Sequence, residues 1–263
     1  MLLPNTITVI TICYNNLKDV TDTCQSVDIQ ELKPFEHLII DGSSNKEVKN
    51  YLETTPQPSY RHWICEPDKG IYDAINKGIR NAGGNIIVML NAGDTFYDKN
   101  AVALASKAFE KDDTLQWLHS KYKLLRGNQW VIVGKPFEKS KLYRGMRSIC
   151  HQSMFVKKQL HDKYGLYSST ETIAADYDFL CRIADEKFIF LTTPLVNFAP
   201  AGISSNNYSL SLTETKKVYE KHFGKSFLMY LWQLRLKALF YLLHSPIGNF
   251  LYKIKTSLKL ENL

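Results

Sequence analysis

Apolar positions in the first hundred residues follow two different periods. Short runs rich in apolar or β-branched residues predict strands in four segments: residues 7–12, 37–41, 61–65 and 85–90. Apolar residues three and four positions apart predict helices over residues 17–27 and 71–82. Alternating strands and helices are typical of βαβ units, so we predict an α/β fold with a mostly parallel, doubly wound sheet.

The pattern between residues 100 and 205 is less regular. It predicts helices over residues 101–109 and 176–185. It also predicts four short strands: residues 115–125, 130–133, 188–191 and 195–198. No linker rich in Pro, Gly or Ser interrupts this region, so we expect residues 1–210 to form one domain and residues 211–263 a helical extension.

The extension has its own composition. Apolar and aromatic residues crowd positions 226–243, and the longest uncharged run, residues 238–252, is shorter than the about 20 apolar residues that span a bilayer. Residues 214–263 hold nine Lys or Arg against three acids, out of a net charge of +7. We therefore predict an amphipathic helical extension that lies on an anionic membrane surface. A helical hairpin packed on the core or on a second subunit is the alternative.

Composition and charge exclude several classes of protein. Of the 263 residues, 44% are hydrophobic and 22% are charged, so the chain can bury a core. Five scattered cysteines without C-x-x-C spacing predict neither a disulfide framework nor a zinc site. The first residues lack the features of a signal peptide, so we expect a cytoplasmic protein. Because the basic excess lies in the extension, we expect no nucleic-acid partner.

Polar residues follow three of the predicted strands, where parallel α/β sheets bind ligands. Asp41 could accept a ring N–H of a nucleobase or form an Asp–Gly turn. Lys69 precedes a helix with Asp73 and Asn76 on its polar side, which suits a diphosphate or a solvated helix surface. Asp94, with substrate phosphates, could hold Mg²⁺ or Mn²⁺, or form a turn.

Candidate chemistry also occurs further along the chain. Asp176, near a helix start, could remove a proton from a hydroxyl group or complement the helix dipole. His151, beside Gln152, could be functional or structural. The loop with Gly202 and Ser204 could approach a substrate or turn the chain.

Taken together and in order, these segments resemble the family 2 glycosyltransferases over about residues 5–205. The resemblance rests on residues 8–15, 40–44, 66–78, 90–94, 151–152, 175–178 and 202–204. It is strongest for the bacterial subset that builds capsule, exopolysaccharide or lipopolysaccharide, including enzymes similar to colanic acid glycosyltransferases.

The resemblance implies a GT-A fold and inverting transfer from a nucleotide-diphospho sugar to a saccharide or lipid-linked acceptor. UDP-sugars are the favoured donors and GDP-sugars the alternative. It implies Asp176 as general base and Asp94 as the acid that binds Mn²⁺ or Mg²⁺. The donor side is expected to hold Thr11, Tyr14, Asn15, Asp41, Lys69, Asp73, Asn76 and Asn91. The acceptor side is expected to hold His151, Gln152, Gly202 and Ser204.

The chain departs from the family motifs at two positions. Asn91 stands where the metal-binding D-x-D motif has its first acid, and Ala175 replaces the Glu of the E-D motif. The first change implies a looser preference between Mg²⁺ and Mn²⁺, and it leaves an inactive transferase open.

The resemblance also implies an enzyme that is peripheral on the inner face of the bacterial cytoplasmic membrane, with a homo-oligomer open. Two other functions are alternatives. A sugar-phosphate nucleotidyltransferase would carry a Gly-rich, basic loop after the first strand. This chain has Cys-Tyr-Asn-Asn-Leu at residues 13–17, which argues against that alternative. A non-catalytic basic membrane-associated protein would carry basic residues throughout the chain, whereas here the basic excess lies in residues 214–263.

Overall fold

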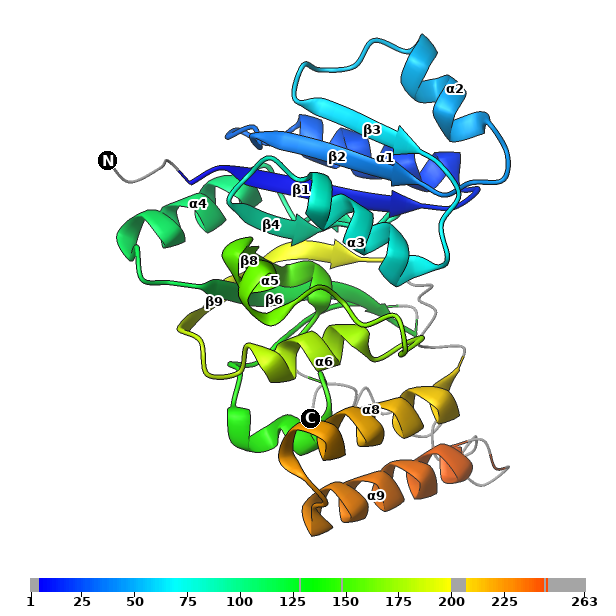
Figure 1. The fold of residues 1–263 in the computed structure, drawn as a ribbon, viewed down its shortest axis with the longest axis vertical. Coiled ribbons are helices and arrows are strands. Elements are labelled where there is room, and N and C mark those ends of the chain that lie inside the picture. Colours follow the sequence, from blue (N-terminus) through cyan, green and yellow to red (C-terminus); the bar gives the residue numbers. More distant parts are fainter. Residues whose placement is uncertain (1–4, 128, 148, 200–206, 244, 246–263) are drawn as a thin grey trace.

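A single sheet runs through the computed structural model of the protein, which describes residues 5–127, 129–147, 149–199, 207–243 and 245 (Figure 1). The strand order is β3-β2-β1-β4-β8-β6-β9-β5, and β7 pairs with β6. The first four strands are mutually parallel: β1 (Ile7–Cys13), β2 (Glu36–Asp41), β3 (Arg61–Cys65) and β4 (Ile86–Met89). The chain moves outward from β1 to β3 and then returns to β4 on the other side of β1. The doubly wound α/β fold is therefore confirmed.

The second half of the sheet mixes directions. It consists of β5 (Thr95–Phe96), β6 (Trp117–Arg126), β7 (Gln129–Val133), β8 (Met154–Lys157) and β9 (Phe188–Phe198). β8 is antiparallel to both β4 and β6, whereas β9 is parallel to β6. The two short strands predicted over residues 188–191 and 195–198 are one strand, because the residues between them stay in β9. The register with β6 shifts between Ser120 and Tyr122, which absorbs the extra residues.

Helices cover both faces of the sheet. The face that contains Ile10 and Ile12 packs against α3 (Ile71–Asn81), α5 (Gln159–Tyr164) and α6 (Ala175–Arg182). The opposite face contains Val9 and Cys13, and packs against α1 (Leu17–Asp28), α2 (Glu47–Thr54) and α4 (Ala101–Lys111). The alternation of side chains along β1 thus supplies both layers of the core.

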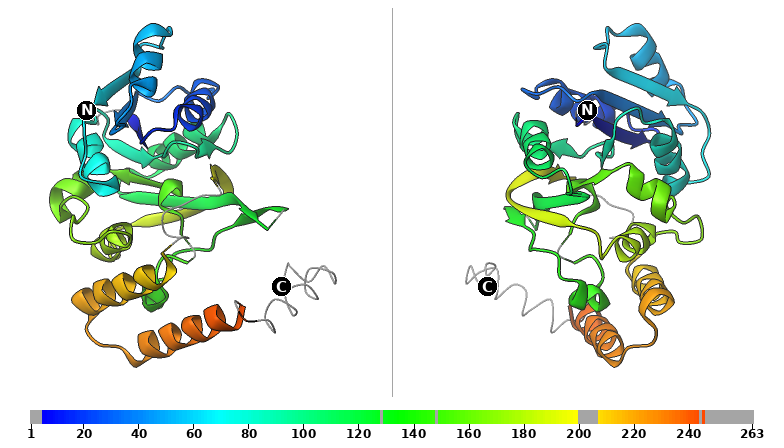
Figure 2. Two further views of the ribbon diagram at one scale, coloured as in Figure 1. Left: turned by 90° about the vertical axis from the view of Figure 1, so that its right-hand side faces the viewer. Right: turned by 60° about the vertical axis from the view of Figure 1, so that its left-hand side comes forward.

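Two antiparallel helices, α8 (Tyr208–Phe223) and α9 (Phe227–Leu243), lie at one end of the molecule (Figures 1 and 2). They contact α6 and a short 3₁₀ helix, η1 (Lys139–Arg144); a second one, η2 (His151–Ser153), precedes β8. Leu212 of α8 and Leu236 of α9 are buried, but large apolar side chains also cover the outside of α9. Within the described residues, no helix combines the length and hydropathy required of a membrane span.

Candidate active site

Asp41 lies at the carboxyl end of β2, between the ends of its two neighbours. It is in register with Cys13 of β1 and Cys65 of β3. Its buried carboxylate accepts hydrogen bonds from the backbone N–H of Ser43 (3.0 Å) and from the Cys13 thiol (3.5 Å). Asp41 is therefore held at the edge of the sheet where α/β proteins bind ligands.

Two glycines bring the loop after β3 over the end of β2. A Cβ atom at Gly42 would lie 1.7 Å from a carboxylate oxygen of Asp68, so only glycine leaves room for that side chain. Asp68 accepts the backbone N–H of Gly70 (2.8 Å), and Gly70 has φ +113°, which suits glycine. This arrangement leaves Lys69 exposed at the start of α3.

Asn15 and Asp73 support this edge through hydrogen bonds within the protein. The backbone N–H of Asn15 donates to the hydroxyl of Ser43 (2.7 Å), and its side-chain oxygen accepts the backbone N–H of Ser44 (3.1 Å). The carboxylate of Asp73 accepts the backbone N–H of Lys69 (3.0 Å), which satisfies a donor at the start of α3. Both side chains therefore shape the loops around Asp41.

Two residues expected at the donor make buried hydrogen bonds within the fold. Thr11 is fully buried, and its hydroxyl donates to the carbonyl of Leu90 (2.8 Å) and contacts His37 (2.9 Å). Asn76 is buried rather than on the polar side of α3, and its amide exchanges two hydrogen bonds with the backbone of Tyr167 (2.9 and 3.0 Å). The expected place of Asn76 on the polar side of α3 is therefore wrong, whereas a role for Thr11 or Asn76 at the donor stays a prediction.

Asn91 and Asp94 form the turn after β4, at the point where the sheet reverses direction. Burial raises the pKa of Asp94 to about 7. Two hydrogen bonds act in the opposite direction and lower this pKa: one from the backbone N–H of Ala199 (2.8 Å) and one from the side chain of Gln152. The side-chain oxygen of Asn91 is buried, and no residue that the structure describes forms a hydrogen bond with it. These oxygens fit a hard divalent cation, which would also favour the charged form of Asp94.

A cation at this turn would need ligands from outside the protein. Within the ranges that the structure describes, no group of three or more His, Cys, Asp or Glu side chains is arranged to hold a metal. Phosphate oxygens of a substrate and water would therefore complete its coordination.

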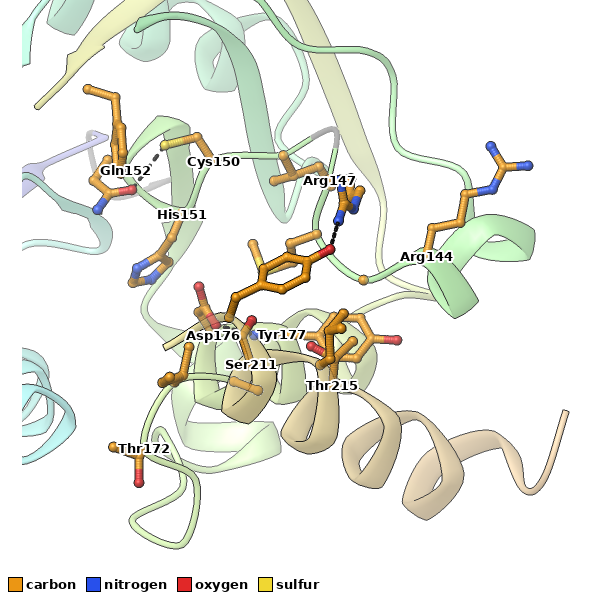
Figure 3. Close-up of a pocket in the computed structure, with 18 of the residues that line it drawn as sticks. Arg144, Arg147, Cys150, His151, Gln152, Thr172, Asp176, Tyr177, Ser211 and Thr215 are labelled. Atoms are coloured by element: carbon orange, nitrogen blue, oxygen red, sulfur yellow. Dashed lines mark hydrogen bonds between the residues drawn. The ribbon is translucent and has the colours of Figure 1, made fainter. Parts of the chain in front are cut away.

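A pocket of about 400 Å³ opens beside Asn91. Its wall comes from segments far apart in the sequence, including α3, β6, residues 144–147 and 149–152, the start of α6, and both α8 and α9. Asn91, His151, Gln152 and Asp176 all line this pocket, and Figure 3 shows His151 and Asp176 projecting into it from different segments. The fold thus brings together four residues that the sequence analysis singled out separately.

Asp176 is the ionisable acid of this pocket. Burial raises the pKa of Asp176 to about 6, and the charge of Glu214 contributes to this rise. The backbone N–H of Tyr177, which donates to the carboxylate at 2.8 Å, lowers the pKa. Tyr72 lines the pocket next to the acid, and its hydroxyl donates to the carbonyl of Ile173 (2.6 Å). A carboxylate with a pKa of about 6 is mostly charged at pH 7, yet basic enough to accept a proton.

Glu214 of α8 holds the loop that leads into α6. Its carboxylate accepts the backbone N–H groups of Thr172 (3.0 Å), Ile173 (2.7 Å) and Ala174 (3.0 Å). These N–H groups lie at the helix start, where backbone donors have no partner within the helix. Sequence reasoning missed Glu214, because an acid among lysines on a helix is typical of a solvated surface. Its burial is the signal that identifies it.

The acceptor-side residues have different surroundings. His151 Nε2 lies 2.6 Å from the hydroxyl of Tyr167, and burial lowers the pKa of His151 to about 4, so the imidazole is neutral at pH 7. Gln152 accepts a hydrogen bond from the Cys150 thiol (3.0 Å). Gly202 and Ser204 lie outside the described residues.

Comparison with known proteins defines the class and then the family. An uncharacterised glycosyltransferase of Mycobacterium tuberculosis is 35% identical over 182 residues, which cover 68% of this chain and 69% of that protein. The model of the family "Glycosyl transferase family 2" matches residues 8–165. This protein is a glycosyltransferase, and it belongs to family 2.

Solved structures share the fold. The mannosyltransferase PcManGT from Pyrobaculum calidifontis, in complex with GDP-Man and Mn²⁺, aligns with a TM-score of 0.64 at 18% identity, over 99% of this chain and 82% of that one. TarS from S. aureus, in complex with UDP-GlcNAc, aligns with a TM-score of 0.61 at 13% identity, over 87% of this chain and 70% of that one. The expected GT-A fold is confirmed.

Replacing Glu214 with Gln should loosen the start of α6 without unfolding the protein. A neutral amide is a weaker acceptor than a carboxylate, so the amides of residues 172–174 should exchange with solvent about tenfold faster or more. Hydrogen exchange followed by mass spectrometry measures this. Glu220→Gln, on the same helix and 3.7 Å from Lys216, is the matched control. Unchanged protection of residues 172–174 would contradict the assigned role.

Proposed function

We propose that the protein is an inverting glycosyltransferase of bacterial surface polysaccharide biosynthesis. It would move a sugar from a nucleotide-diphospho sugar to a hydroxyl group of a saccharide or lipid-linked acceptor. Asp176 supports this most directly: it is a carboxylate with a pKa of about 6 in a pocket that it shares with Asn91. The pocket therefore contains both the proposed base, Asp176, and Asn91, which follows β4 at the proposed donor side of the sheet.

In this reaction Asp176 accepts the proton of the acceptor hydroxyl while the hydroxyl oxygen attacks the anomeric carbon. The bond from that carbon to the diphosphate breaks, and the nucleoside diphosphate leaves with the electron pair. A single in-line displacement inverts the configuration at the anomeric carbon. General base catalysis of this kind contributes about 10²–10⁴-fold to a rate.

For the donor we propose the edge formed by the loops after β1, β2 and β3. Tyr14, which is 62% exposed, offers a ring for stacking, and the carboxylate of Asp41 can accept a nucleobase N–H. Lys69 offers a positive charge to the diphosphate at the start of α3. UDP-sugars are our first choice and GDP-sugars our second; TarS binds UDP-GlcNAc and PcManGT binds GDP-Man.

For the metal we propose Mn²⁺ or Mg²⁺ at Asp94, with Asn91 as the second protein ligand. The unpartnered oxygen of Asn91 and the raised pKa of Asp94 support this assignment. When bound, such a cation neutralises charge on a diphosphate leaving group. The PcManGT complex contains Mn²⁺.

For the extension we propose contact with an anionic membrane surface, which would keep the enzyme at the inner face of the cytoplasmic membrane. The following large apolar side chains of α9 are exposed: Phe227, Leu228, Tyr230, Leu231, Leu234, Leu239, Tyr241 and Leu242. Arg235 and Lys237 lie on the same helix, a combination typical of helices at lipid headgroups. A second copy of the chain is the alternative partner and would make a homo-oligomer.

Asp176→Asn should lower the rate of transfer about 10²–10⁴-fold and leave donor affinity unchanged. In the wild-type protein the rate should fall as the pH falls through about 6, because only the deprotonated carboxylate can accept a proton. The variant should lack this dependence. Released nucleotide measures the rate, and calorimetry measures donor affinity. Asp162→Asn, an exposed acid on α5, is the control; loss of donor affinity in Asp176→Asn would refute the role as base.

Asp94→Ala should remove the metal-dependent part of nucleotide binding. Wild-type protein should bind UDP or GDP more tightly with Mn²⁺ than with EDTA, whereas the variant should bind equally weakly in both. Asp113→Ala, an exposed acid before β6, should behave like the wild type. Equal wild-type affinity with and without EDTA would contradict a metal at this turn.

Polar substitutions on the outside of α9 should detach the protein from vesicles. We expect wild-type protein to sediment with phosphatidylglycerol vesicles, and the triple variant Phe227→Gln, Leu234→Gln, Tyr241→Gln to stay in the supernatant, because these exposed side chains supply the apolar contact. Trp130→Gln, on β7, is the control. If the wild-type protein does not sediment, the outer face of α9 has another partner.

A further inference from the structure

We propose that the pocket contains an anion-binding subsite that takes the diphosphate group of a lipid-linked acceptor. The subsite, which we call the arginine cluster, consists of Arg144, Arg147 and Trp232, which line the pocket, and of Arg235, which lies against Trp232. The proposal rests on the proposed function and deepens it, because it assigns the chemical class of the acceptor.

Three guanidinium groups gather around one indole ring. The Cζ atoms lie 5.2 Å (Arg144), 5.9 Å (Arg147) and 5.1 Å (Arg235) from the centroid of the Trp232 ring. These arginines come from η1, from the segment after it and from α9. Three like charges therefore lie within 5.9 Å of the centroid of one ring. Cation–π attraction alone does not favour crowding of like charges.

No carboxylate neutralises this charge within the described part of the chain. Arg144 donates to the hydroxyl of Tyr143 (2.9 Å), and Arg147 donates to the hydroxyl of Tyr208 (3.3 Å), so both have neutral acceptors. None of the ion pairs formed by the described residues includes Arg144, Arg147 or Arg235. A ligand with more than one negative charge would relieve their mutual repulsion.

Trp232 adds an unused hydrogen-bond donor. Its indole Nε1 is buried and has no hydrogen-bond partner among the described residues, although Trp232 lines the pocket. A buried donor without an acceptor costs free energy, and an anionic oxygen would satisfy it. Planar guanidinium groups match phosphate oxygens in two-point hydrogen bonds. The donor set therefore fits a phosphate or diphosphate.

The position of the cluster assigns it to the acceptor rather than to the sugar donor. Arg144, Arg147 and Trp232 line the same pocket as Asp176. They belong to η1, the segment after it and α9. Helix α9 lies at the end of the molecule away from β1–β4, whose carboxyl ends form the proposed donor edge (Figure 1). A sugar joined through a diphosphate to a lipid could present its hydroxyl to Asp176 and its phosphates to the cluster. Its apolar chain would then follow the exposed side of α9.

The test is calorimetry of the full chain with three probes. Farnesyl diphosphate and farnesol are used below their micelle concentrations, and inorganic diphosphate is the third probe. We expect farnesyl diphosphate to bind most tightly, and farnesol about 100-fold more weakly or worse, because it carries no charge. Arg147→Gln and Arg235→Gln should each weaken farnesyl diphosphate about tenfold, the usual effect of losing a charge-assisted hydrogen bond. Trp232→Phe, which keeps a ring but loses the N–H, should weaken it about threefold.

Arg80→Gln, an exposed arginine at the end of α3, is the matched control and should bind like the wild type. Thermal melting of each variant verifies that it is folded. The proposal is wrong if folded Arg147→Gln and Arg235→Gln bind farnesyl diphosphate as tightly as the wild type, or if farnesol binds equally well.

Two further outcomes would reassign the cluster and overturn the proposal. If UDP displaces farnesyl diphosphate and the arginine variants lose affinity for UDP, the cluster binds the donor. If the variants lose only their sedimentation with phosphatidylglycerol vesicles, it binds membrane headgroups. Failure of the wild-type protein to bind any nucleotide would refute the proposed function, whereas the farnesyl diphosphate titration decides the subsite independently.

Discussion

The carboxylate of Glu214 joins the C-terminal hairpin to the acid of the pocket. A buried charge is unfavourable unless it is well paired, and three backbone N–H groups pair this one. Helices α6 and α8 also meet at a second point, where the carboxylate of Asp178 of α6 contacts Lys221 (2.9 Å) and His222 (2.8 Å) of α8. Helices α6 and α8 therefore position each other, and Asp176 lies between these two points of attachment. The hairpin is part of the wall of the site and not only an appendage.

The sequence predicted what depends on local periodicity and could not predict what depends on distant partners. Strands β1–β4 and helix α3 follow from apolar spacing. Asp176 is predicted as a base from its place near a helix start and from the family resemblance, whereas Asn91 is predicted from the resemblance alone. Asn76 shows why a distant partner cannot be predicted from local sequence. It lies on the predicted helix, but its side-chain amide donates a hydrogen bond to the carbonyl of Tyr167, 91 residues away. Glu214 shows the opposite error, since only its tertiary contacts distinguish it from a surface acid.

The basic excess of the extension, which in the sequence indicates a membrane surface, is divided between different environments. Lys221 lies against Asp178 and so stabilises the contact between α6 and α8. Lys216 pairs with Glu220 on the surface of α8. Arg235 instead lies 5.1 Å from the indole ring of Trp232, and Trp232 lines the pocket. Net charge alone could not separate a structural role from a ligand-binding one, because both use the same residue types.

The most direct test of the account is to incubate the protein with UDP-, GDP-, dTDP- and CMP-sugars in the presence of Mn²⁺ or Mg²⁺ and to measure released nucleotide. We predict turnover of donors that carry one of these four nucleotides, with UDP the first choice, and faster release of nucleotide when a lipid-linked saccharide is added. If none of the four nucleotides is released and calorimetry detects no binding of any of them, the protein does not use a nucleotide-sugar donor and the account is wrong.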